Sequence, residues 1–470
     1  MDKVQKYIVL SIGLYFGWLL SVPFNGPIMY ACITSFEADI SIPTIYIFSH
    51  ALGLLVLGIM VKRAEHWRSL LLYGGGFSLA LSLLVFFMPL IFWPFIYALI
   101  GFSSAMFVLG WSYPFTFGID MKSRLKHMAL TIIISNVIYV FLSIFLTILQ
   151  LQLVYFIALL FLAGSFKVSM FLTRIDFQDI QKNNSKNNKR EEIQVFPGVL
   201  IFITCLLIFG LYINGGFMYQ VMYPSLIKYE DIAVFYRPLP YIAVLAVMWR
   251  YGNVLQKQLP VYMGVSFMGL AFISFSLLHN TLRGFFLIET LIQSSFAFLD
   301  LFFFTILGDI SVINRSPIKT FGFGIAAMVG AILTGGLLGE QLMIIGERYH
   351  LFTAMFALSA IFLTFLIIPW MFNKIDAFYN SSKNEEANYP KTNMELFESV
   401  FGAHALTARE MEIVELLLQG FTNKQIAAQL YVSENTLKTH IKNIYYKLQV
   451  STRRELMSIV LGNKENHPKG

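Results

Sequence analysis

The chain has 470 residues, of which 57% are hydrophobic and only 13% are charged, and its mean hydropathy is +0.67. Ordinary soluble domains carry nearer a quarter charged residues, so this composition excludes a soluble globular protein and indicates an integral membrane protein. The formal charge is +7, and the only cysteines, Cys32 and Cys205, give neither a disulfide framework nor the spacing of a metal site.

Apolar segments long enough to cross about 30 Å of hydrocarbon recur along residues 1–372. The first lacks a small-residue cleavage site after Lys3 and Lys6, so we interpret it as a retained span. The polar stretch 173–196 separates two halves, 1–172 and 197–372. We expect an all-α membrane domain of about twelve helices, near 7–30, 42–61, 69–88, 91–112, 127–149, 151–172, 198–222, 232–249, 259–278, 284–308, 320–342 and 350–372.

Basic residues in the short loops predict the orientation. Lys62, Arg63 and Arg124 fall on the same side as the N-terminus, whereas the first loop on the other side carries Glu37 and Asp39. An even number of spans returns the C-terminus to the starting side. The pattern therefore predicts a multi-pass protein of the inner (cytoplasmic) membrane with both termini in the cytoplasm.

Ionisable residues inside spans cost about 2.5–3.5 kcal/mol at a helix centre and usually face an interior cavity. In the tenth span, Glu289, Gln293 and Asp300 share one helical face at positions i, i+4 and i+11. In the eighth span, Arg237 precedes Pro238 at an expected kink.

Two interpretations of these polar residues stay open. They line a cavity for a small-molecule effector, or Arg237 pairs with one carboxylate and merely holds helices together. His50 is expected to be a hydrogen-bonded packing residue. The candidate effector-binding residues are Glu289, Gln293, Asp300, Arg237, Asn214 and Asn25. No catalytic, metal-binding or cofactor-binding motif is present, so we expect no enzyme activity and no cofactor.

The membrane half is followed by a polar segment, 373–400, that we expect to be a linker. If it is flexible, about 28 residues span roughly 30 Å on average. Residues 401–465 then predict a separate domain of four short helices. Thr407–Glu410 and Thr422–Gln425 are capping boxes, Gly420 is a helix stop, and Ser433 and Thr452 are N-caps.

The third of these helices has two distinct faces. Leu437, Ile441, Ile444 and Leu448 form an apolar stripe, and Asn435, Lys438, Thr439 and Lys442 form a polar, basic face. Two short helices ahead of a longer one with an exposed basic face are typical of a helix-turn-helix. Periodicity alone also fits a small bundle with solvated lysines.

The run Leu-Thr-x-Arg-Glu (406–410), Gly420, Thr-Asn-Lys-x-Ile-Ala (422–427) and Ser-Glu-x-Thr-Leu-Lys-x-His-Ile-x-Asn-Ile-Tyr (433–445) closely resembles the LuxR/NarL-type helix-turn-helix. The resemblance implies a double-stranded DNA partner and a homodimer on DNA, with the fourth helix in the dimer contact. It implies that Lys438, Thr439 and Lys442 face base edges and phosphates, with Asn435 on the same face. Lys424 and Thr436 are implied backbone contacts.

Residues 1–372, with six plus six spans and a polar central loop, resemble the major facilitator superfamily. Where that superfamily carries Gly-x-x-x-Asp after its second span, this chain has Gly58 leading to Lys62. The missing aspartate favours a sensor over a working carrier, because a sensor needs only to bind and shift population. We therefore expect a membrane-embedded one-component transcription regulator. The alternative is an active secondary transporter with an appended regulatory domain.

Overall fold

The computed structural model describes residues 2–24, 26–36, 41–177, 197–252, 258–344, 348–388 and 406–462. Every regular element in these ranges is a helix, as expected for an all-α chain. The chain divides into two compact units, residues 1–372 and 373–470, which are described separately.

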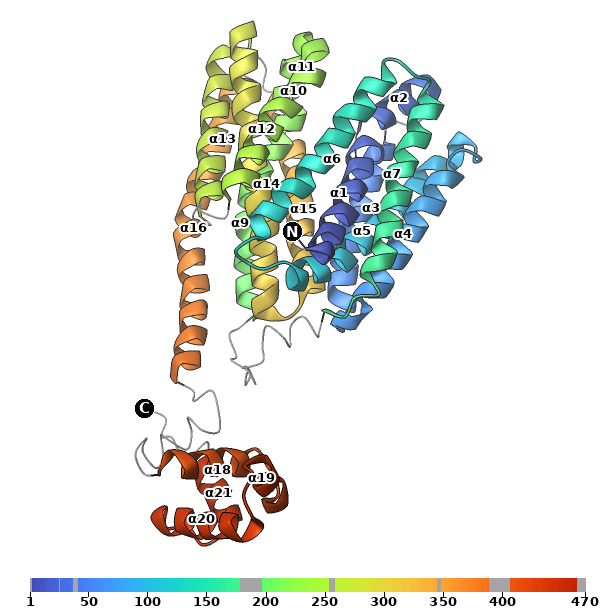
Figure 1. Cartoon of the computed structure of the whole chain (residues 1–470). Coiled ribbons are helices and arrows are strands. Elements are labelled where there is room, and N and C mark those ends of the chain that lie inside the picture. Colours follow the sequence, from blue (N-terminus) through green and yellow to red (C-terminus); the bar gives the residue numbers. More distant parts are fainter. Residues whose placement is uncertain are drawn as a thin grey trace. The chain divides into compact units, whose positions relative to one another are not determined.

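The first half of unit 1 is a bundle in which α1 packs on α6 and α7, and α5 packs on α3 and α4 (Figure 1). Its helices are long because uninterrupted apolar sequence leaves backbone groups no partner in hydrocarbon except one another. They are α1 (Lys3–Ser21), α2 (Pro27–Phe36), α3 (Ile42–Met60), α4 (Trp67–Leu84), α5 (Trp93–Gly118), α6 (Arg124–Leu146) and α7 (Leu151–Leu172), with short 3-10 turns η1 (Ala64–His66) and η2 (Leu90–Phe92).

The second half forms a matching bundle, in which α9 packs along α15 and α13 along α14. The π-helical turn η3 (Met218–Met222) follows α9, and η4 (Ile227–Tyr229) precedes α11. The helices are α9 (Pro197–Phe217), α10 (Tyr223–Ser225), α11 (Glu230–Tyr236), α12 (Pro238–Tyr251), α13 (Leu259–Leu278), α14 (Leu282–Asn314), α15 (Pro317–Met343) and α16 (Tyr349–Asn388).

Eleven helices in the described part of unit 1 are long and apolar enough to cross a membrane, one fewer than the twelve expected. The difference lies at the expected span 69–88. Helix α4 occupies that region and packs against α5 and α7, but it is not among the eleven. Its first turn contains Arg68, and its glycines and serines lower the hydropathy of the rest.

Two expected spans are interrupted by proline. The first ends at Ser21 instead of running to residue 30, and the chain restarts at Pro27 as α2. The proline rings remove amide donors and end the helix. The eighth is divided at Arg237, which lies between the last residue of α11 and Pro238 at the start of α12.

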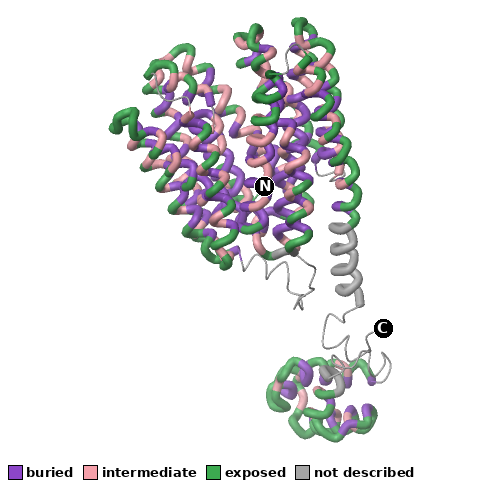
Figure 2. Tube along the Cα trace, turned by 180° about the vertical axis from the view of Figure 1, so that it is seen from behind, coloured by how far each residue is buried: buried purple, intermediate pink, exposed green. Residues whose placement is uncertain are grey.

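The outer surface of unit 1 is apolar. Figure 2 shows exposed residues along the outward faces of its helices and buried ones inside each bundle. Among the exposed side chains are Phe202, Phe362 and Leu366, each more than 60% accessible. So large an exposed apolar surface is unfavourable in water but is favourable in contact with lipid.

Glycines permit the closest helix crossings. A Cβ atom on Gly335 of α15 would lie 2.0 Å from the carbonyl oxygen of Ile213 on α9, and one on Gly216 would lie 2.2 Å from the amide nitrogen of Gly336. On α4, a Cβ on Gly74 would meet the Phe107 amide nitrogen at 2.3 Å. Close helix packing therefore requires glycine at positions 74 and 335, whereas a Cβ on Gly336 would meet nothing within 4 Å.

The two halves contact each other through α3 with α15, α6 with α12, and α5 and α6 with α14. In Figure 1 the bundles diverge toward the end that carries α2 and α11. Helix α14, which holds Glu289, Gln293 and Asp300, and helix α12, which begins directly after Arg237, therefore lie beside the first half.

Unit 2 contains α18 (Ala408–Leu418), α19 (Asn423–Gln429), α20 (Glu434–Lys447) and α21 (Arg453–Gly462) around its own apolar core. The expected stripe on α20 is buried in that core: Leu437, Ile441, Ile444 and Leu448 are all less than 9% exposed. The core of unit 2 is thus formed by residues of these four short helices and of the turns before and between them.

The predicted linker begins as helix instead of flexible chain. Helix α16 continues through Asn388, sixteen residues past Phe372. Alanine, lysine and glutamate in 373–388 are good helix formers, and the first proline comes at 390. The helical part of the segment extends about 24 Å at 1.5 Å per residue. The rest of the predicted linker lies outside the described residues.

Candidate DNA interface and membrane-domain site

Side-chain caps fix the ends of the helices in unit 2. Thr407 and Thr422 each accept a hydrogen bond from the amide three residues later, and Glu410 Oε2 and Gln425 Oε1 each accept one from the cap amide. Ser433 accepts from the Thr436 amide at 3.1 Å and begins α20. These local bonds confirm the predicted helix starts and set the direction in which α20 presents its polar face.

All six predicted DNA-contact residues are exposed on unit 2. On α20, residues separated by three or four positions share a face, so their side chains form one continuous polar surface opposite the buried stripe. The six are Lys424, Asn435, Thr436, Lys438, Thr439 and Lys442. We call the surface formed by the α20 residues of this set the basic face; these residues are Asn435, Thr436, Lys438, Thr439 and Lys442.

Three polar contacts that sequence reasoning missed hold α20 and its neighbours in place. Lys447 Nζ lies 2.7 Å from Glu410 Oε2 and joins α20 to α18. Burial alone would raise the pKa of the Glu410 carboxyl, but hydrogen bonds from Lys447 and Thr407 outweigh it and hold the pKa at about 2. Arg453 donates 2.6 Å hydrogen bonds to the carbonyl oxygens of Phe421 and Leu417.

Two exposed aromatic side chains on unit 2 were also not predicted. Tyr446 is 85% accessible and lies one helical turn beyond Lys442 on α20. Tyr431, in the turn between α19 and α20, is 96% accessible and has φ of +55°. A left-handed tyrosine is uncommon, and Arg409 stabilises this turn by donating to the Leu430 carbonyl at 2.8 Å.

In the membrane unit, Arg237 is the centre of an ion-pair network. Its Nε lies 3.0 Å from Glu289 Oε1, and its two terminal nitrogens lie 2.9 and 3.0 Å from the Glu230 carboxylate. Its guanidinium carbon also lies 3.9 Å from the centroid of the Tyr223 ring. Gln293 donates to both Tyr223 and Glu289, at 2.8 and 3.2 Å. Arg237 thus pairs with Glu289, as the second interpretation of the sequence expected.

Asp300 has a different environment. Its two carboxylate oxygens accept hydrogen bonds from Tyr212 on α9, at 2.6 Å, and from Tyr241 on α12, at 2.5 Å. Among the described residues no basic side chain forms an ion pair with it. Eleven residues of helix, about 16 Å, separate it from Glu289, so the face of α14 carries two centres instead of one.

The remaining predicted effector residues are not brought to these centres by any described contact. Asn214 is fully buried; its amide nitrogen bonds to carbonyls of its own helix, and its Oδ1 has no hydrogen-bond partner among the described residues. Asn25 lies outside the described residues. His50 is a hydrogen-bonded packing residue, as expected, because its Nδ1 lies 2.6 Å from Ser104 Oγ and 3.2 Å from the Gly101 carbonyl oxygen.

A second buried ion pair, between Arg124 and Asp309, was not predicted. Arg124 begins α6 and is 1% exposed, and Asp309 lies on α14. The guanidinium also donates to the Thr116 carbonyl at 2.8 Å and the Ile119 carbonyl at 3.2 Å. Sequence reasoning had used Arg124 only as a loop charge. The pair connects the two halves directly.

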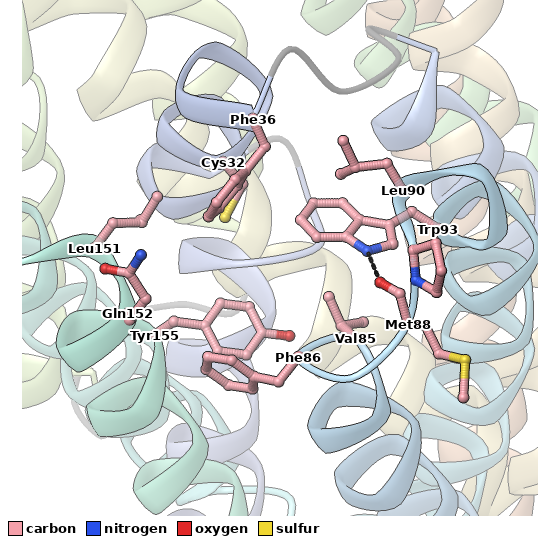
Figure 3. A pocket seen from close by; sticks show the side chains of 11 residues that line it. Cys32, Phe36, Val85, Phe86, Met88, Leu90, Trp93, Leu151, Gln152 and Tyr155 are labelled. Atoms are coloured by element: carbon pink, nitrogen blue, oxygen red, sulfur yellow. Dashed lines mark hydrogen bonds between the residues drawn. The ribbon is translucent and has the colours of Figure 1, made fainter.

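An apolar pocket of about 260 Å³ lies in the first half (Figure 3). Trp93 and Tyr155 face it from α5 and α7, and the Trp93 indole nitrogen donates to the Met88 carbonyl at 3.2 Å. Its lining is Cys32, Phe36, Val85, Phe86, Met88, Pro89, Leu90, Trp93, Leu151, Gln152 and Tyr155. None of these is charged, and none belongs to the Arg237 or Asp300 centre.

Unit 2 has clear relatives. Residues 404–460 match the family described as bacterial regulatory proteins, luxR family. This unit is a LuxR-type helix-turn-helix domain. It is 51% identical over 49 residues to a nitrate/nitrite response regulator protein homolog of Haemophilus influenzae, 10% of this chain and 24% of that protein. It is 48% identical over 50 residues to the transcriptional regulator MalT of Vibrio campbellii, 11% of this chain and 6% of the relative.

Those relatives match only the LuxR-type domain, so the chain spans a small part of their length. Unit 1 instead resembles transporters of the major facilitator superfamily in fold. A bacterial homologue of ferroportin in an outward-facing state matches with TM-score 0.56 and 14% identity over 79% of this chain and all of the other. The transporter FucP, in an outward conformation, matches with TM-score 0.54 and 12% identity, over 77% and 98%. The chain thus joins a major facilitator fold to a LuxR-type domain.

Proposed function

We propose that the protein is a membrane-embedded one-component transcription regulator, in which the major facilitator-like unit binds a small molecule and thereby controls the LuxR-type domain. The observation that carries the proposal is the presence of both units in one chain. When a domain that binds duplex DNA is tethered to a bilayer, an event in the membrane can control its binding to DNA. The two polar centres in α14 supply the residues for an effector site.

The DNA-binding step uses the basic face of α20 in the major groove. Lys438, Thr439, Lys442 and Asn435 contact base edges or nearby phosphates, and Lys424 and Thr436 contact the backbone. Two LuxR-type domains bind half-sites about one helical turn apart, with α21 from Thr452 onward in the dimer contact. Effector binding changes how readily two domains meet on DNA.

Lys442→Ala should weaken operator binding by about 1–3 kcal/mol if the side chain reads a base edge. The substitution removes an exposed charge and barely alters helix propensity, so the LuxR-type domain should keep its circular dichroism spectrum. Fluorescence anisotropy on an operator fragment, found by genome-wide mapping of bound DNA, measures the loss.

Gln419→Ala is the control, because it shortens an exposed side chain at the end of α18, outside both the basic face of α20 and the proposed dimer contact of α21. It should leave operator affinity unchanged. Operator affinity unchanged in Lys442→Ala would remove this lysine from the interface.

Orientation is part of the proposal, because the LuxR-type domain must face the nucleoid. A reporter that is active only in the cytoplasm should work when fused after Asn373 or within 182–189, and should be silent at Glu37. Loop charge and the position of the DNA-binding unit both support this topology. An active fusion at Glu37 would reverse the assignment.

The rival function is active transport with an appended regulatory domain, and the fold similarity to transporters favours it. The missing aspartate after Gly58 favours the sensor. Proteoliposomes that contain the full chain distinguish the two. Counter-flow of a bound compound supports the transporter, whereas binding that changes promoter occupancy without flux supports the sensor.

A further inference from the structure

We infer that Asp300, with Tyr212, Tyr241 and Tyr219, is a subsite for an organic ammonium group, so that the effector is a cation. The inference rests on the proposed function, which supplies the reason for a ligand, and adds the ligand's chemical class. The subsite takes its parts from α9, η3, α12 and α14.

Carboxyl groups outnumber basic groups at the two polar centres. The two centres on this side of unit 1 contain three carboxyl groups, Glu230, Glu289 and Asp300, and one guanidinium, that of Arg237. Arg237 pairs with Glu230 and Glu289, and among the described residues no basic side chain forms an ion pair with Asp300. A carboxylate in a membrane interior is stable when a cation reaches it.

The Asp300 carboxylate has acceptor positions that the two tyrosines do not use. A carboxylate has about four acceptor positions, and the two phenol hydroxyls use one on each oxygen. The side chain is only partly buried. Because both tyrosines donate, they hold the carboxylate oxygens in fixed directions before a ligand arrives.

An accessible tyrosine ring belongs to the same subsite as Asp300. Tyr219, 47% accessible, lies seven residues after Tyr212, and its ring centroid is 5.6 Å from that of Tyr223, over which Arg237 lies. Tyrosine faces attract cations, and here Arg237 already lies over Tyr223, whereas no described cation lies over Tyr219.

These features select an organic ammonium over a metal ion. Divalent metals are held by several carboxylate, imidazole or thiolate groups, and no group of three such side chains occurs in the described residues. One carboxylate with open aromatic faces instead fits an alkylammonium, whose charge pairs with Asp300 and whose methyl or methylene groups contact the rings.

The test uses the full chain in detergent micelles and four probes: choline, tetramethylammonium, benzyltrimethylammonium and 2-phenylethylammonium. The neutral isostere of choline, 3,3-dimethylbutan-1-ol, is the control ligand. At least one cation should raise the thermal unfolding temperature with saturation, whereas the alcohol should not. If no cation does so, or the alcohol acts equally, the inference is wrong.

Asp300→Asn should weaken the binding of the active cation by about tenfold or more, because a charge-assisted contact is lost. Glu340→Gln, an exposed position on α15, should bind it as the wild type does. A second pair avoids any effect on folding: Tyr219→Leu should weaken binding, and Tyr219→Phe, which keeps the aromatic face, should retain it. Unchanged affinity in Asp300→Asn and Tyr219→Leu would overturn the subsite.

A promoter reporter separates this inference from the proposed function. If a cation binds through Asp300 but never changes promoter occupancy, the subsite stands and the sensor function fails. If promoter occupancy responds only to neutral or anionic compounds, the sensor function stands and the ammonium subsite fails.

Discussion

Asp309→Ala should destabilise the membrane unit by about 3–5 kcal/mol, the cost of leaving one partner of a buried ion pair without the other. Arg124 is 1% exposed and cannot move its guanidinium to water, and two backbone carbonyls alone do not neutralise it. The loss should be read from denaturant unfolding of the full chain in detergent, followed by tryptophan fluorescence.

The double variant Arg124→Met, Asp309→Leu is the control for this prediction. Replacing both members of a buried pair by apolar side chains is often neutral or stabilising, so the double variant should regain most of the lost stability. A double variant as unstable as Asp309→Ala would show that Asp309 stabilises the fold mainly through contacts other than Arg124.

Gly335→Ala should disrupt the crossing of α9 and α15. The new Cβ would lie 2.0 Å from the Ile213 carbonyl oxygen and 3.1 Å from the Gly216 Cα, and neither backbone can rotate away. Overpacking typically costs about 1–3 kcal/mol, and a backbone clash lies at the upper end. The unfolding temperature in detergent and the monodisperse fraction should both fall.

The adjacent glycine provides the matched control. A Cβ on Gly336 would meet nothing within 4 Å, and alanine favours a helix over glycine by about 1 kcal/mol. Gly336→Ala should therefore be neutral or slightly stabilising. If both alanine variants behaved alike, close approach of the two helices would not be the reason for glycine at 335.

Features encoded in a few neighbouring residues were predictable from the sequence. The caps at Thr407, Thr422 and Ser433 depend on contacts three residues apart, and the stripe from Leu437 depends on helical periodicity alone. The family resemblance, carried by the same short spacings, was confirmed by the match over 404–460. Contacts between residues close in sequence thus determine where most helices of unit 2 begin and which face of α20 is buried.

The polar centres of the membrane unit depend on contacts between residues far apart in the chain. The partners of Asp300 are 88 and 59 positions away, and 185 positions separate Arg124 from Asp309. Helical periodicity placed Glu289 and Asp300 on one face, but it carries no information on which helix packs there. Glu289 and Asp300 were therefore predictable from the sequence, whereas Tyr212, Tyr241 and Asp309 were not.

The position of Glu230 has a consequence for the synthesis of the protein. Chains emerge from the N-terminus, so Arg237 reaches the membrane some fifty residues before Glu289 on α14 has been made. Glu230, seven residues earlier, already contacts both terminal nitrogens of Arg237. The nascent segment thus carries its own counter-ion during insertion, when an unpaired arginine would be most costly. Glu289, on a helix that is made later, completes the pairing in the folded protein.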